Sequence, residues 1–378
     1  MPTQGRHAAD DDPTEVIERI PAPRRAPRSS GVDSPVVDSP LVEPAPAPPK
    51  RRFGRGTRIA LVIVASLAVL IGVAFGGTAL WLNSVASSVD RVDAFGGVPE
   101  AERPQKAEAA KNAMNFLLLG SDSRNPDNQD GSRSDTIIVL HLNQTHTKAQ
   151  MVSIPRDTWV YVPKAPKSQY GNREAKINAA YAWGGVPGIV QTVERFTNIR
   201  IDHVVMVDFS GFKEIVDALG GVDINVSESF TSTHSLDPSG TRHFEKGLQT
   251  MDGATALDYA RERYAFQDGD FARIRHQQQV IKAVLNKAAS GGTLSSPGKL
   301  NDFLHATADA ATVDDTLNMF DMAMELRNIR GDDVTAYTSP TKGTGMKGDE
   351  SVVLADTELV KPFFDALRED RPLPEPTK

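Results

Sequence analysis

A long run without a single charged side chain constrains this chain most. It extends from Ile59 to Leu82 and reads IALVIVASLAVLIGVAFGGTALWL. A helix over these residues would be roughly 36 Å long at ~1.5 Å per residue, enough to cross the ~30 Å hydrocarbon core of a bilayer. The run is too long for the apolar core of a cleaved signal peptide. The sequence therefore predicts one transmembrane helix over 59–82.

Basic side chains gather just before this run, whereas charges of both signs follow it. The basic residues are Lys50, Arg51, Arg52, Arg55 and Arg58. Because positive charge stays on the cytoplasmic side, we expect a single-pass plasma-membrane protein with a cytoplasmic N-terminus and residues 83–378 outside the cell. Residues 1–58, rich in Pro, Ala, Ser and Asp, are typical of a disordered tail with a basic juxtamembrane segment.

Composition limits the chemistry that the rest of the chain can perform. With no cysteine in 378 residues, disulfides and thiolate metal sites are impossible, and a hard cation held by oxygen ligands stays open. A formal net charge of −7 gives no general attraction to nucleic acid, and residues 1–50 lack a helix-turn-helix pattern. Any bound anion must therefore meet a local cluster of positive charge.

Beyond the apolar run, a polar segment over 83–112 predicts an extracellular stalk, residues 113–370 a folded domain, and residues 371–378 a frayed end. Strand patterns and helical periodicity alternate in the domain, which favours a layered α/β fold. The expected strands are 115–119, 135–143, 148–154, 202–207, 222–226 and 334–338. The expected helices are 187–198, 209–219, 274–289, 299–311, 316–328 and 357–369.

Acidic side chains lie at the ends of neighbouring strands. Asp122 follows the first strand in NFLLLGSDSR, and Asp135 precedes the second in RSDTIIVLHLN. If these strands are antiparallel neighbours, the two carboxylates meet and repel unless a cation lies between them. Mg²⁺, held by one or two carboxylates, water and phosphate oxygens, suits such a pair. The alternative is that each Asp stabilises a turn, which is its commoner use when alone.

Arginine accompanies these acids. The residues are Arg124, Arg133, Arg156, Arg261, Arg263, Arg273 and Arg275. Arg261 and Arg263 would share a face if YARERY is extended. The guanidinium group binds phosphate oxygens bidentately, so the set favours a diphosphate with a metal over isolated surface ion pairs. Phosphate-binding glycine loops, HExxH and GxSxG are absent from the sequence.

The ordered blocks resemble the LytR-CpsA-Psr family of cell-wall assembly enzymes over roughly residues 113–370. Besides the strand-end motifs they include SIPRDTWV, KINAAYAWGG, MDGATALDYARER and GDFARIRHQQQ. The resemblance implies a layered α/β/α domain with a central mixed sheet, preceded by one transmembrane helix. It also implies a transferase that moves a glycan from a polyprenyl-pyrophosphate carrier to a peptidoglycan sugar hydroxyl through a phosphodiester.

The same resemblance assigns roles to residues of this chain. Asp122 and Asp135 match the metal-linked acids. Arg156, Arg261 and Arg263 match the arginines that bind the pyrophosphate, with Arg124, Arg133, Arg273 and Gln277 as further pocket residues. Arg156, Asp122 and Asp135 are the expected catalytic set. The chain departs from the family at His276, where arginine is common, and Arg275 is a possible replacement for that charge.

Two other functions stay open from sequence. The same residues would suit a polyprenyl-pyrophosphate scaffold or pyrophosphatase, and the family is also associated with transcriptional attenuation. The glycan, whether teichoic acid, arabinogalactan or another polymer, is not specified. A polyprenyl chain also needs an apolar tunnel, for which helices 187–198, 209–219 and 274–289 carry enough apolar side chains.

Overall fold

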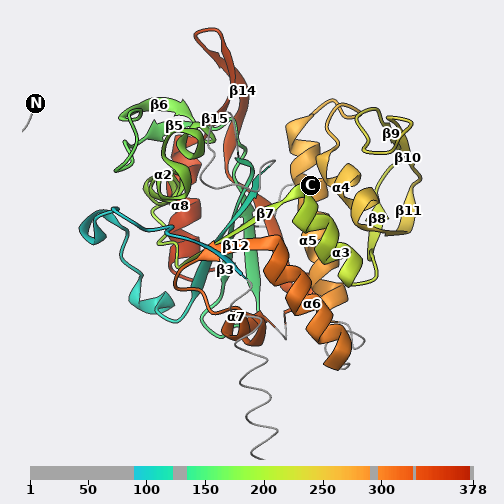
Figure 1. The fold of residues 1–378 in the computed structure, drawn as a ribbon. Helices are drawn as coiled ribbons and strands as arrows, with labels where there is room; N and C mark the ends of the chain where they lie inside the picture. Colours follow the sequence, from blue (N-terminus) through green and yellow to red (C-terminus); the bar gives the residue numbers. More distant parts are fainter. Residues whose placement is uncertain (1–88, 122–133, 290–296, 327–328, 375–378) are drawn as a thin grey trace, which may run out of the picture. The chain divides into compact units, whose positions relative to one another are not determined.

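A seven-stranded mixed sheet forms the centre of the domain in the computed structural model, which describes residues 89–121, 134–289, 297–326 and 329–374 (Figure 1). Its strand order is β1-β12-β7-β2-β3-β4-β13. The bounds are Asp90–Val92 for β1, Ala311–Asp314 for β12, His203–Asp208 for β7, Met114–Ser121 for β2, Ser134–Leu142 for β3, Ala149–Ser153 for β4 and Val334–Thr338 for β13. Parallel and antiparallel pairs alternate irregularly, so the predicted α/β fold with a central mixed sheet is confirmed.

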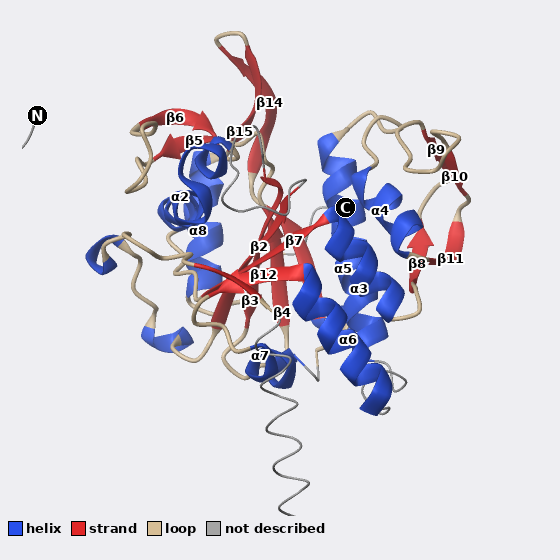
Figure 2. Ribbon diagram, viewed as in Figure 1, coloured by secondary structure: helices blue, strands red, loops and turns tan. Residues whose placement is uncertain are grey.

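Helices cover both faces of this sheet (Figure 2). They are α2 (Ala179–Thr197), α3 (Phe209–Ala218), α4 (Gly253–Arg261), α5 (Asp270–Ala289), α6 (Pro297–Ala310), α7 (Met319–Leu326) and α8 (Thr357–Arg368). All but α4 were expected from helical periodicity. Helix α2 begins earlier than predicted because a kink at Gly185 (φ 60°, ψ −151°) joins an extra turn to the part that contains Pro187.

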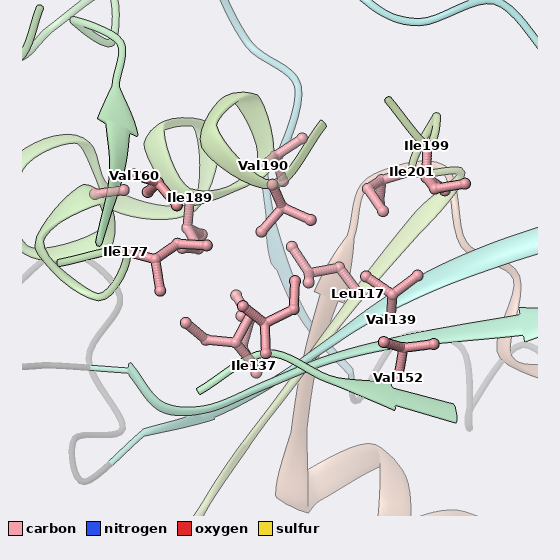
Figure 3. Packing of buried hydrophobic residues seen from close by; sticks show 14 of the residues in the cluster. Leu117, Ile137, Val139, Val152, Val160, Ile177, Ile189, Val190, Ile199 and Ile201 are labelled. Atoms are coloured by element: carbon pink, nitrogen blue, oxygen red, sulfur yellow. The ribbon is translucent and has the colours of Figure 1, made fainter. Parts of the chain in front are cut away.

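One face of the sheet packs against α2 and α8. In Figure 3, Ile189 and Val190 of α2 meet Leu117, Ile137 and Val139 of the sheet. These side chains are no more than 2% exposed. The alternation of apolar side chains along β2 and β3 produces this face, because side chains of a strand alternate between its two sides.

The opposite face of the sheet packs against α5 and α6. Phe116, Ile138 and Leu140 of the sheet form a second apolar cluster there with Leu304 and Ala308 of α6. A third cluster lies between α4, α5 and the β8–β11 pair (Val222–Val226 and Gly247–Met251). The predicted strand 222–226 is therefore β8, and its partner in the structure is β11 rather than the central sheet.

Three further strand pairs are separate from the central sheet, and the sequence patterns did not predict them. They are β5–β6 (Trp159–Val162 and Arg173–Lys176), β9–β10 (Phe230–Ser232 and Arg242–Phe244) and β14–β15 (Thr341–Lys347 and Glu350–Ala355). Short 3-10 turns occur at Glu100–Glu102, Glu108–Ala110 and Gly331–Asp333.

The expected membrane helix over 59–82 and the tail over 1–58 lie outside the described residues. Within the described ranges, no helix is long and apolar enough to cross a bilayer. In the segment assigned to a stalk, β1 joins the edge of the sheet beside β12, and Ala94 and Ala110 are buried. Leu373, in the segment expected to fray, is also buried.

Candidate active site

The strand ends that carry Asp and Arg meet at one edge of the sheet. β2 and β3 are antiparallel neighbours, as predicted, and Ser121 at the end of β2 pairs with Ser134 at the start of β3. β4 runs antiparallel to β3, so its C-terminal end lies at the same edge. The N–H of Ile154 donates to the carbonyl of Ile137 at 2.8 Å, which brings the following residues level with Asp135. Strand register therefore places Arg156 beside Asp135.

Arg156 is surrounded by carboxylates. Its guanidinium donates to Asp135, and its Nε lies 3.7 Å from Oδ2 of Asp157 and 4.0 Å from Oδ1 of Asp270. Burial alone would lower the pKa of Arg156, but the carboxylates of Asp135, Asp270 and Asp157 outweigh it and raise that pKa above its ordinary value. The guanidinium of Arg156 therefore stays positively charged in the cavity, with or without a bound anion.

Helix α5 contributes a second arginine to the same point. Nη2 of Arg273 lies 2.8 Å from Oδ1 of Asp270, one turn earlier, and donates to the backbone carbonyl of Asp135 at 3.3 Å. Gln277 follows one turn later on the same helix face. The buried Arg273 is therefore held in position by groups from both α5 and β3.

Arg261 and Arg263 come from the end of α4 rather than from an extended segment. Helix α4 ends at Arg261, and Glu262 has extended backbone angles, so the assumption that YARERY is wholly extended is wrong. Cζ of Arg261 lies 4.6 Å from the ring centre of Phe209, and Cζ of Arg263 lies 4.6 Å from that of Tyr264. The helix end and the following turn nevertheless direct both residues to the same cavity as Arg156.

These groups line one polar cavity of about 320 Å³, which we call the arginine cavity. Its predicted members are Asp135, Arg156, Arg261, Arg263, Arg273 and Gln277. Asp122, Arg124 and Arg133 lie outside the described residues, although Ser121, which precedes Asp122, pairs next to Asp135 in the strand register. Four guanidinium groups around one space provide the charge and geometry that phosphate oxygens require.

An apolar cavity of about 250 Å³ adjoins the arginine cavity and shares Thr136, Phe209, Arg261 and Gln277 with it. Its walls come from the sheet, α3, α4 and α5, including Val205, Phe212, Val280, Ile281 and Val284. Helices 209–219 and 274–289 were expected to line such a space. Helix 187–198 was expected to do so too, which is wrong, because Ile189, Val190 and Val193 pack on the other face of the sheet.

The donor set is compatible with Mg²⁺. Asp135 brings a carboxylate to the arginine cavity, and Mg²⁺ commonly takes one or two carboxylates together with water and phosphate oxygens. Over the described ranges, no three His, Asp or Glu side chains are grouped to hold a metal ion by themselves.

Several cavity residues had not been singled out from the sequence. Thr136, Phe209, His234, Glu262 and Tyr264 all line the arginine cavity. Glu262 accepts the N–H groups of Arg263 and Tyr264 at 2.8 and 2.6 Å, which fixes the turn that carries both residues. The only sequence signal for Glu262 was its position between the two arginines. His234 stacks on Tyr264, but the two residues lie 30 positions apart, and no local sequence pattern indicates that they meet.

His276 does not line the cavity, and Arg275 does not replace a cavity charge. His276 stacks on Tyr259 at 4.2 Å between ring centres, and its Nδ1 lies 3.1 Å from the Tyr259 carbonyl. Arg275 is exposed and pairs with Asp268 at 2.5 Å. His276, the position where the family commonly has arginine, therefore belongs to an aromatic cluster with Phe230 and Phe266 and not to the lining of the cavity.

His276 is expected to make stability depend on pH. Burial, assisted by the charge of Arg275, lowers the pKa of His276 from 6.5 to about 4. Between these two pH values His276 is protonated in the unfolded chain but neutral in the folded protein. The free energy of unfolding therefore falls by about 3 kcal/mol as pH drops from ~6.5 to ~4. Urea unfolding at pH 7.5 and 4.5 should show a smaller pH effect for His276→Phe than for the wild type. An identical pH effect in both proteins would contradict this.

Comparison with known proteins adds an independent result. The LytR_cpsA_psr family matches residues 83–369. The polyisoprenyl-teichoic acid–peptidoglycan teichoic acid transferase TagU of Bacillus mycoides is 35% identical over 270 residues, covering 68% of this chain and 81% of that protein. The cell wall biosynthesis protein LcpA of Corynebacterium glutamicum is 29% identical over 379 residues, covering 88% and 70% respectively. The crystal structure of B. subtilis TagV aligns with a TM-score of 0.58 and 27% identity, over 69% of this chain and 97% of that one.

Proposed function

The chain belongs to the LytR-CpsA-Psr family, and on that basis we propose that it is a membrane-anchored transferase of cell-wall glycopolymers. In this proposal a glycan passes from a polyprenyl-pyrophosphate carrier to a peptidoglycan sugar hydroxyl through a phosphodiester. Its relatives are named for the transfer of teichoic acid to peptidoglycan and for cell wall biosynthesis. The observation that carries the proposal is the arginine cavity joined to an apolar cavity, which suits a diphosphate attached to a lipid.

The chain's own residues would bind and orient the diphosphate. Arg156 and Arg273, held together around Asp135, would bind oxygens of the phosphate next to the sugar, and Arg261 and Arg263 would bind the neighbouring phosphate. The acceptor oxygen forms a bond to the sugar-proximal phosphorus as the bridging P–O bond breaks. Polyprenyl phosphate leaves with the electron pair, and its negative charge is stabilised by the guanidinium groups.

Asp135 and Asp122 are the proposed metal ligands and Mg²⁺ the proposed ion. Bound there, Mg²⁺ would neutralise charge on the phosphate oxygens that the arginines do not reach. The proton of the acceptor hydroxyl goes to a nearby carboxylate or to water. Because Asp157 already pairs with Lys176 at 3.4 Å, we assign it the positioning of Arg156.

The apolar cavity is the proposed site for the start of the polyprenyl chain. Burial contributes about 0.8 kcal/mol for each CH₂ removed from water, so the lipid adds affinity without taking part in the chemistry. The predicted span over 59–82 would hold the domain at the outer membrane surface, where such a carrier is found. Plasma-membrane localisation with the domain outside is part of this proposal.

Product analysis tests the proposed function. The full-length chain in detergent is incubated with a polyprenyl-pyrophosphate-linked oligosaccharide, peptidoglycan fragments and Mg²⁺, with and without EDTA, and products are weighed by mass spectrometry. We expect an adduct of glycan, phosphate and acceptor that needs the metal. Free glycan phosphate without an adduct would identify a pyrophosphatase, and bound but unchanged donor would identify a scaffold.

Filling the apolar cavity should weaken use of long carriers. Val284→Phe adds a ring to the part of the cavity wall that α5 contributes, two turns beyond the shared residue Gln277, and we expect KM for a long polyprenyl donor to rise about tenfold. A donor with only two or three isoprene units should change little, because it does not reach that wall. Leu248→Phe, at a residue 76% exposed on β11, serves as the control. Equal KM changes for both donors would argue against this site for the lipid.

A further inference from the structure

A second polar cleft, of about 800 Å³, shares no lining residue with the arginine cavity. It lies where α2, the end of β5 and the segment around residue 103 meet. Its lining includes Tyr161, Lys164, Asn172, Gln191 and Arg195, together with the ion pair of Arg103 and Glu194. Nothing in the proposed handling of the lipid diphosphate uses this polar cleft.

The wall of the polar cleft combines an aromatic ring with amides and cations. Cζ of Arg195 lies 4.7 Å from the ring centre of Tyr161, and Oδ1 of Asn172 accepts the N–H of Lys164 at 3.1 Å. Oε1 of Gln191 is buried and has no hydrogen-bond partner within the part of the chain that the structure describes. An aromatic face beside amides and an unsatisfied acceptor is suited to a ligand with apolar ring faces, hydroxyls and N–H groups.

The charges of the polar cleft favour a ligand that also carries carboxylates. Arg103 and Glu194 neutralise each other at 2.7 Å in a buried pair. Lys164 and Arg195 line the cleft without a carboxylate partner among the described residues. They outnumber the one further lining carboxylate, Glu102, which accepts a hydrogen bond from Nε2 of Gln191 at 3.4 Å, so a net positive charge faces the ligand.

A row of exposed and half-buried side chains connects the arginine cavity to the polar cleft. Lys176 lies 3.4 Å from Asp157, which in turn lies 3.7 Å from Arg156. Across the β5–β6 pair, Lys176 is the register partner of Trp159, and Glu174 is that of Tyr161. We call Trp159, Tyr161, Glu174 and Lys176 the hairpin face.

The hairpin face turns outward because the other side of β5–β6 is buried. Val160, Val162 and Ala175 point into the core against α2, where Figure 3 shows Val160 near Ile189. Nε1 of Trp159 donates to Oε2 of Glu174 at 2.8 Å, so the indole is held by its neighbour. A turn over residues 155–158 leads from Arg156 into β5, and the strand from Trp159 to Tyr161 then covers roughly 7 Å at ~3.3 Å per residue. The two sites are therefore close along the chain, which allows one polymer to occupy both.

We propose that the hairpin face and the polar cleft bind the acceptor, a linear peptidoglycan strand, and lead one of its hydroxyls to the arginine cavity. The sugar rings of such a strand present apolar faces to Trp159 and Tyr161, and its N-acetyl groups match Asn172 and Gln191. Its lactyl and peptide carboxylates match Lys164 and Arg195. This inference rests on the proposed function for the identity of the acceptor.

Binding without a donor tests this inference apart from the proposed function. The full-length chain in detergent is titrated by calorimetry with a soluble tetrasaccharide of alternating N-acetylglucosamine and N-acetylmuramic acid that carries its peptide stems. Tyr161→Ala combined with Arg195→Ala should weaken binding about tenfold or more. Tyr161→Phe should bind like the wild type, because it keeps the ring. Leu248→Ala and Arg371→Ala are the matched controls, because both residues are exposed and neither lines the polar cleft.

The transfer assay gives the second readout. The double variant should raise the acceptor KM about tenfold while binding of the polyprenyl-pyrophosphate donor stays unchanged. Equal tetrasaccharide affinity for the wild type and the double variant would overturn the inference, even if transfer itself is observed. Conversely, specific tetrasaccharide binding that the double variant loses would support the acceptor site even if the transferase proposal fails.

Discussion

Replacing Arg156 by alanine is expected to lower the rate of glycan transfer about 10³-fold, because a guanidinium that stabilises a transferring phosphoryl group is worth that much or more. Arg156 is the residue on which the carboxylates of Asp135, Asp157 and Asp270 converge. Its loss removes the fixed positive charge beside the proposed reacting phosphorus. It also leaves three carboxylates facing an incoming anion.

Single-turnover kinetics with a preloaded donor would measure this effect on the chemical step. Arg156→Lys should recover only part of the rate, because lysine keeps the charge but loses the bidentate geometry. Arg275→Ala is the matched control, since Arg275 is exposed and pairs with Asp268 away from the cavity. If Arg156→Ala transferred glycan within about threefold of the wild type, Arg156 would not contact the reacting phosphate.

Replacing Glu194 by alanine is expected to destabilise the fold by about 3–5 kcal/mol, because it leaves a buried charge without its partner. The side chains of Arg103 and Glu194 are 7% and 3% exposed. Glu194 also accepts the N–H of Ile201 at 2.9 Å, and Arg103 donates to the Ile201 carbonyl at 2.6 Å. One pair thus holds the segment before β2 against α2 and the loop that joins α2 to β7.

Urea unfolding of both proteins would measure the change. The double variant Arg103→Met and Glu194→Leu should lose much less stability than Glu194→Ala, because it removes both charges together. Glu369→Ala is the control, since Glu369 is half-exposed and its ion pair with Arg371 should contribute about 0–1 kcal/mol. A loss below about 1 kcal/mol for Glu194→Ala would show that the Arg103 charge finds water or another partner.

Strand register explains why the sequence predicted the centre of the site. Period-two alternation located β2, β3 and β4, and antiparallel pairing then brings Asp135 and Arg156 to one edge without further information. The helical period of α5 likewise places Arg273 and Gln277 on one side of the helix and Arg275 on another. Local sequence patterns were sufficient to place a site residue wherever that residue belonged to a long strand or helix.

Short elements and distant contacts were not predictable in this way. Helix α4 has only the sequence GATALDYAR, too short for a clear apolar period, so the sequence did not predict that a helix ends at Arg261. His234 and Tyr264 meet through tertiary packing. The polar cleft arises where α2, β5 and the segment near Arg103 come together, and no single stretch of sequence contains that arrangement.

The most direct measurement follows the sugar-proximal phosphorus of the donor. The full-length chain is given a polyprenyl-pyrophosphate-linked oligosaccharide with ³²P at that position, together with peptidoglycan and Mg²⁺, and the label is divided into wall-bound and soluble fractions. The proposed transferase places the label on peptidoglycan in an acid-labile phosphodiester, and Arg156→Ala does not. Label that appears only as soluble glycan phosphate, or that stays on the lipid, would contradict transfer as the function of this protein.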